Sequence, residues 1–125
     1  MSFLLLSVDH IIVIHDEVLE PHELQGMAGD KSLEGALSRV ENRLNYGLIE
    51  DIYSLAASYA VAVSQAHCFN DGNKRTAFQV MDLILDLNGI NAVWNAEEVG
   101  QKIVLLSQSK LDETDLAQWL RRVIV

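Results

Sequence analysis

The sequence lacks three features that would each point to a particular class of protein. It has one cysteine, Cys68, so an internal disulfide is impossible and a reducing cytoplasm is the expected compartment. The apolar run at residues 3–6 is too short for a signal peptide, and no other run approaches the roughly 18 apolar residues of a membrane span. Only 9 basic residues oppose 18 acidic ones, and the net charge of −9 argues against nucleic-acid binding. We therefore expect neither a membrane nor a nucleic-acid partner.

Proline is almost absent as well, and the rest of the chain is rich in helical patterns. Half of the 125 residues are hydrophobic and one is proline, which fits one compact domain over residues 1–125. Apolar residues recur at three- and four-residue spacing in six stretches. Their starts are marked by helix-capping or acidic residues or by a glycine-containing turn, at Ser7, Asp30, Glu50-Asp51, Asn73 or Lys74, Asn95 and Asp112. We predict an all-α bundle of about six helices.

One polar stretch, residues 67–76, separates the two most apolar helical runs and has the composition of a phosphate site. Gly72 allows positive φ, so the peptide N–H groups that follow can converge on an anion at a helix N-terminus. Lys74 and Arg75 add positive charge, and Asp71 suits a Mg²⁺ ion that bridges protein and phosphates. Histidine ordinarily titrates near neutrality, so His67 is the candidate general base.

Each of these residues also has a plainer interpretation. Asn, Asp and Gly commonly form ordinary turns, and a single histidine before a helix break is more often a capping or core residue. Cys68 has no second cysteine and no separate base beside it, and it is interpreted as a partly buried filler rather than a nucleophile. His10 and His15 lie five residues apart, which places them on different helix faces, so we do not interpret them as a metal pair.

The run from His67 to Arg75 resembles the signature of the Fic/Doc superfamily, H-x-F-x-[DE]-G-N-[GK]-R, without a gap. The lysine at position 74 resembles the Doc (death on curing) branch, whose members are toxins of bacterial toxin–antitoxin pairs. Residues 35–37 and 42–47 look like the family's flap segment, and residues 43–49 could either be extended beside the motif or form a frayed helix end. Residues 87–89 look like the end of its central helix. The resemblance implies the compact, all-α Fic fold, with a short extended flap as an option.

The resemblance also implies a role for each motif position. His67 is then the general base on a target hydroxyl, Phe69 the buried anchor of the loop, and Asp71 the ligand of Mg²⁺. Four further positions surround the phosphates of ATP, namely Gly72, Asn73, Lys74 and Arg75. AMP-transferring members carry a second glycine where this chain has Lys74 and a second arginine where it has Phe78. This departure favours transfer of the γ-phosphate, as in the Doc branch.

Three functions remain open from the sequence. The resemblance favours an ATP-dependent toxin that phosphorylates a hydroxyl of translation elongation factor Tu and arrests translation. The alternatives are AMP transfer to a protein Ser, Thr or Tyr, and a catalytically idle domain that only binds a partner. Self-inhibited family members carry the pattern [ST]-x-x-x-E-[GN], which residues 109–114 fail at the last position. We therefore expect a cognate antitoxin that supplies an inhibitory segment in trans.

Overall fold

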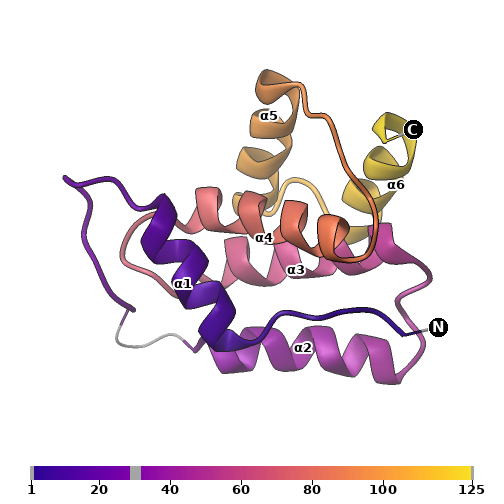
Figure 1. Cartoon of the computed structure of the whole chain (residues 1–125), viewed down its shortest axis with the longest axis horizontal. Coiled ribbons are helices and arrows are strands. Elements are labelled where there is room, and N and C mark those ends of the chain that lie inside the picture. Colours follow the sequence, from indigo (N-terminus) through magenta and orange to yellow (C-terminus); the bar gives the residue numbers. More distant parts are fainter. Residues whose placement is uncertain (1, 29–31, 125) are drawn as a thin grey trace.

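The chain forms six α-helices in the computed structural model, which describes residues 2–28 and 32–124 (Figure 1). The prediction of an all-α fold with about six helices is confirmed. None of the helices in the described part of the chain is long and apolar enough to cross a membrane. The helices are α1 (Val8–Val18), α2 (Leu33–Asn45), α3 (Ile52–Ala66), α4 (Asn73–Leu87), α5 (Ala96–Ser107) and α6 (Glu113–Val123).

Five of these helices begin at a side chain that accepts a hydrogen bond from their own first turn. The capping residues are Ser7, Ser32, Asp51, Asn95 and Asp112. Each such cap is worth about 0.5–2 kcal/mol of stability. Asp30, the predicted cap of the second helix, lies outside the described residues, and α2 is instead capped by Ser32. Only α4, among the described helices, begins without a side-chain cap.

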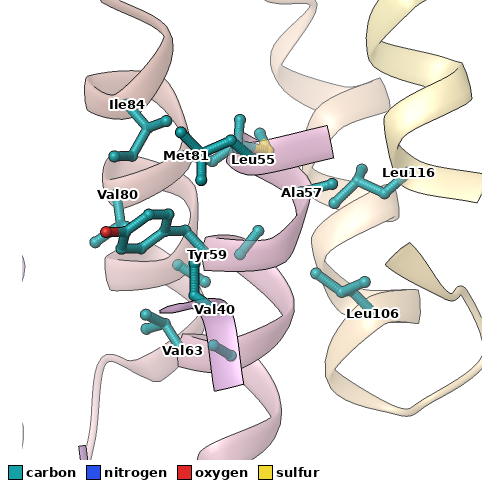
Figure 2. Packing of buried hydrophobic residues seen from close by; sticks show 14 of the residues in the cluster. Val40, Leu55, Ala57, Tyr59, Val63, Val80, Met81, Ile84, Leu106 and Leu116 are labelled. Atoms are coloured by element: carbon teal, nitrogen blue, oxygen red, sulfur yellow. The ribbon is translucent and has the colours of Figure 1, made fainter. Parts of the chain in front are cut away.

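Helix α3 lies at the centre and packs against α2, α4, α5 and α6 (Figure 1). Its sequence is rich in alanine and serine, and these small side chains let neighbouring helices approach closely. Leu55, Tyr59 and Val63 of α3 meet α4, whereas Ala57 is directed toward α5 and α6 (Figure 2). Burying one aliphatic side chain of this kind contributes about 1.5–3 kcal/mol. The motif therefore lies between the two helices that form the middle of the core.

The start of α3 is fixed by the last helix. The Arg121 guanidinium donates to the Asp51 carboxylate at 2.8 and 3.1 Å and to the Ser54 hydroxyl at 2.8 Å. This ion pair and the backbone bond from Ser54 lower the pKa of Asp51. Arg121, in the last turn of α6, therefore stabilises the N-terminus of α3.

Of the two alternatives for residues 43–49, the structure shows the helix end, because the segment contains the last residues of α2 and the turn that follows them. Residues 43–45 belong to α2, and Arg43 forms an ion pair with Glu113 at the start of α6 at 2.7 Å. The extended segment that lies beside the motif is residues 24–28, in the connection between α1 and α2, where Met27 forms an isolated antiparallel bridge with Phe69. We call residues 24–28 the bridging segment. Its pairing partner lies more than 40 residues away, so local periodicity could not reveal it.

Candidate active site

The motif occupies a tight loop between two left-handed residues. His67 ends α3 with φ 50° and ψ 43°, and Gly72 precedes α4 with φ 81°. A left-handed conformation is unfavourable for a non-glycine residue, and such strain tends to concentrate at functional sites. At position 72 the φ of 81° would strain any residue with a side chain, which explains the glycine there. These two residues turn the chain back, so that His67 and the start of α4 face the same space.

The loop is held from inside by the Asn73 side chain. Its amide oxygen accepts from the Phe69 N–H at 3.1 Å, and its amide nitrogen donates to the Phe69 carbonyl at 2.9 Å. Phe69 is buried, and its ring lies parallel to the His15 ring with centroids 3.7 Å apart. The side chain of Asn73, predicted to surround phosphates, is therefore used to close the loop. Its backbone N–H remains in the first turn of α4.

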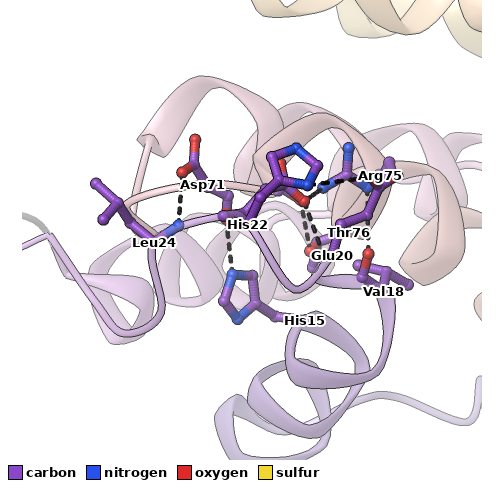
Figure 3. Close-up of polar contacts among 10 residues, drawn as sticks. His15, Val18, Glu20, His22, Leu24, Asp71, Arg75 and Thr76 are labelled. Atoms are coloured by element: carbon purple, nitrogen blue, oxygen red, sulfur yellow. Dashed lines mark hydrogen bonds and ion pairs between the residues drawn. The ribbon is translucent and has the colours of Figure 1, made fainter.

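The bridging segment holds the loop from outside. The Ala28 N–H donates to the Cys68 carbonyl at 2.7 Å, and the Asn70 N–H donates to the Gly26 carbonyl at 3.1 Å. The Leu24 N–H donates to a carboxylate oxygen of Asp71 at 2.8 Å (Figure 3). The loop conformation thus depends on residues that lie 40 or more positions earlier in the chain.

A cavity of about 220 Å³ opens over the start of α4 and brings the predicted polar residues together. The loop residue Phe69 does not line this cavity; together with His15 it lines a separate cavity. The 220 Å³ cavity, which we call the motif cavity, is lined by Glu23, Ser64, His67, Asn70, Asp71, Gly72, Asn73, Lys74, Arg75 and Ser107. The candidate base His67, the motif carboxylate Asp71 and the cationic start of α4 therefore share a single space.

The two cations of the motif have different surroundings. Lys74 is exposed, and no residue in the described part of the chain forms an ion pair with it. Arg75 forms an ion pair with Glu23, and its Nε donates to the Val18 carbonyl at 3.3 Å. The hydrogen bond from Arg75 lowers the pKa of Glu23 to about 2, and the same pairing raises the pKa of Arg75. An anion entering the cavity would therefore meet Lys74 as an unpaired charge and Arg75 as one already shared.

The first turn of α4 adds to this positive end. Without a side-chain cap, its N–H groups are open to an acceptor, and the helix dipole adds roughly half a positive charge. Asp71 supplies the one motif carboxylate, with one oxygen bound to Leu24 and the other left without a hydrogen bond within the described residues. No group of three or more metal-binding side chains occurs in the described residues. One carboxylate completed by phosphate oxygens and water still fits Mg²⁺, which seldom uses an all-protein cage.

Three contributors escaped the sequence reasoning. Glu23 shares Arg75, the bridging segment binds Asp71 through the Leu24 N–H, and His15 lies fully buried under the loop. His15 follows Ile11 by four residues, and these two are the buried residues of α1. That spacing on an apolar face was a usable signal, because a buried histidine needs polar partners. The pairing of Glu23 with Arg75 had no local signal.

Comparison with known proteins defines the class to which this fold and loop belong. A sequence model of the Fic/DOC family matches residues 5–85, from before α1 to within α4. The chain is a member of the Fic/DOC family. It is also 32% identical over 119 residues to the protein named protein kinase Doc of Escherichia phage P1, and the alignment covers 94% of both chains. The resemblance to the Doc branch is thereby confirmed.

Proposed function

We propose that this protein is the toxin of a bacterial toxin–antitoxin pair and transfers the γ-phosphate of ATP to a hydroxyl of a cytoplasmic protein, elongation factor Tu. The observation that supports this most is the motif cavity, in which His67 shares one space with Asp71 and the uncapped, cationic start of α4. The relative from phage P1 is named a protein kinase. Positioning and charge stabilisation provide most of the catalysis in phosphoryl transfer, and this site offers both.

The proposed reaction balances with one base. The His67 imidazole accepts the proton of the target hydroxyl while its oxygen forms a bond to the γ-phosphorus. The bond between that phosphorus and the bridging oxygen breaks, and ADP leaves. The N–H groups of Gly72 and Asn73, with Lys74, stabilise the negative charge of the phosphates. Mg²⁺, held by Asp71, would neutralise phosphate charge when bound.

Phosphate transfer and AMP transfer are distinguished by position-specific labels. The protein is incubated with purified elongation factor Tu and with ATP labelled at either the α or the γ phosphorus. We expect label on the factor only from γ-labelled ATP. Label from the α position would show AMP transfer and refute the proposed reaction. Phe78 supports this expectation, because it stands where AMP-transferring members have a second arginine and offers no cation to a phosphate. Its ring instead packs edge-on against the Trp94 ring, with the centroids 5.6 Å apart.

Loss of the base tests whether the domain is catalytic at all. We expect His67→Ala to abolish label transfer and growth arrest, because its imidazole is the proposed proton acceptor in the cavity. The matched control is His22→Ala, which removes an exposed histidine outside the motif cavity. Undiminished growth arrest by His67→Ala would favour a domain that acts only by binding a partner.

We further propose that control comes from an antitoxin in trans. Glu113, the glutamate of the incomplete inhibitory pattern, is bound to Arg43 and is therefore engaged away from the motif. An apolar groove of about 500 Å³ runs beside Lys74 and Arg75 and is lined by Phe78, Trp94 and residues of α5. A segment of the antitoxin with an apolar face would fit this groove. Co-expression with the neighbouring reading frame should relieve toxicity, and failure of that rescue would count against this regulation.

A further inference from the structure

His15 is a buried polar residue whose partners all belong to the motif loop or to its own helix. The side chain is buried, and its ring is stacked on Phe69 with an interplanar angle of 5°. Its Nε2 lies 2.7 Å from the Asp71 carbonyl oxygen, and its Nδ1 lies 3.1 Å from a carboxylate oxygen of Asp16. Because a carbonyl oxygen only accepts, Nε2 must carry the proton and donate it. His15 therefore binds the motif at two points, the ring of Phe69 and the backbone of Asp71.

The bond to Asp71 fixes the direction of one peptide group. In a planar trans peptide the carbonyl and the following N–H point in opposite directions. The Asp71 carbonyl points toward His15, beneath the loop (Figure 3), so the N–H of Gly72 points to the other side. Gly72 lines the motif cavity, whereas His15 does not. His15 instead lines the separate cavity below the loop with Phe69.

The carboxylate of the same residue is fixed from another direction. The Leu24 N–H holds the Asp71 side chain while His15 holds the Asp71 backbone (Figure 3). Rotation of the Asp71–Gly72 peptide would break the His15 bond and leave a buried imidazole N–H without an acceptor, at substantial cost. The orientation of the Gly72 N–H is thus set before any ligand arrives.

We propose that His15 is a positioning residue of the phosphate site, which aims the Gly72 N–H into the motif cavity through the Asp71 carbonyl. This inference rests on the proposed function, since it assigns phosphate binding to the motif cavity. It assigns no contact between His15 and the nucleotide. The side chain acts from below the loop, through a hydrogen bond, and its ring stacking adds packing that is separable from that bond.

Two amide substitutions separate the hydrogen bond from the packing. The amide nitrogen of glutamine takes roughly the place of Nε2, whereas that of asparagine takes roughly the place of Nδ1. Both variants lose the aromatic ring, so His15→Gln and His15→Asn share the packing defect and differ in the donor. His15→Phe is the third variant, which keeps the stacking on Phe69 and loses the donor. His22→Gln is the control, because His22 is exposed and does not line the motif cavity.

The first readout is the kinetics of label transfer from γ-labelled ATP. We expect His15→Asn and His15→Phe to raise the KM for ATP by about 10- to 100-fold, from loss of a stabilising hydrogen bond at a charged ligand. His15→Gln should recover most of this loss, because its amide nitrogen can donate to the Asp71 carbonyl. Equal KM values for His15→Gln and His15→Asn would overturn the proposal, and so would an unchanged KM in a folded His15→Phe.

The second readout does not depend on transfer. Inorganic pyrophosphate is titrated into ¹⁵N-labelled protein, and the amide resonance of Gly72 is followed. We expect a saturable shift in the wild type and in His15→Gln, and a weakened or absent one in His15→Asn. If the wild type transfers no label but shows this pattern, the proposed function fails and the positioning role stands. If the Gly72 amide of the wild type does not respond to pyrophosphate, the positioning role is refuted.

Discussion

Substitution of Asn73 tests the interpretation that its side chain closes the loop. In Asn73→Ala, both the N–H and the carbonyl of Phe69 lose the partners that they have at 3.1 and 2.9 Å. Phe69 is only 3% exposed, so water cannot easily replace these bonds. Leaving a buried polar group unsatisfied costs about 1–3 kcal/mol, which gives about 2–4 kcal/mol for the two groups after partial relaxation.

The measurement is urea unfolding followed by circular dichroism. With a denaturant slope of about 2 kcal/mol per molar urea, the loss should shift the unfolding midpoint by roughly 1–2 M. Asn70→Ala is the matched control, because it removes one exposed side-chain bond, from its amide to the Gln25 carbonyl at 2.9 Å. We expect that control to lose less than about 1 kcal/mol. An equal loss in Asn70→Ala and Asn73→Ala would refute the assignment of Asn73 as the internal clamp of the loop.

Two further predictions concern the charges around the motif cavity. Lys74→Ala should raise the dissociation constant for Mg·ATP in calorimetry by about 10- to 100-fold, since one charge-assisted contact is worth roughly 1.5–3 kcal/mol. Lys110→Ala, outside the cavity, is the control, and an equal effect of the two would contradict the assignment. Glu23→Gln should be less stable than the wild type above pH 4.5, because Arg75 depresses the folded-state pKa of Glu23 from 4.5 to about 2. That stabilisation is lost as the pH falls through the folded-state pKa, so the difference between the two proteins should close toward pH 2. Unfolding midpoints at pH 7 and pH 3 measure it, and a difference that stays constant would show that the ion pair is not the cause.

Local sequence features predicted most of the fold correctly. Ser7, Asp51, Asn95 and Asp112 were assigned as helix starts from residue type, and each caps its helix through a bond to an N–H three residues later. Such bonds are made within one turn, so the sequence window that predicts them contains both partners. The start of α4, expected at Asn73 or Lys74, was predicted instead from the glycine turn before it, since this helix has no side-chain cap.

The features that sequence reasoning missed depend on long-range contacts. The bridging segment meets the motif across more than 40 residues, and its few extended residues carry no periodic pattern. Arg75 and Glu23, which form an ion pair, lie 52 positions apart in the sequence. Either residue alone could therefore have been interpreted as solvent-exposed. The Asn73 side chain is a different case. Its bond to Phe69 spans only four residues, but an asparagine at this position is equally suited to bind phosphate, so the residue type did not distinguish the two roles.

The contact between the Leu24 N–H and Asp71 has a consequence for the order of events during synthesis. Its two residues are 47 positions apart, and the backbone must close that long loop before the contact can stabilise anything. During synthesis α1 and the bridging segment emerge from the ribosome first. Their contacts with the motif loop cannot form until α3, the motif and α4 have followed. A growing chain therefore lacks the finished loop until α4 has been made, well after α1 and the bridging segment.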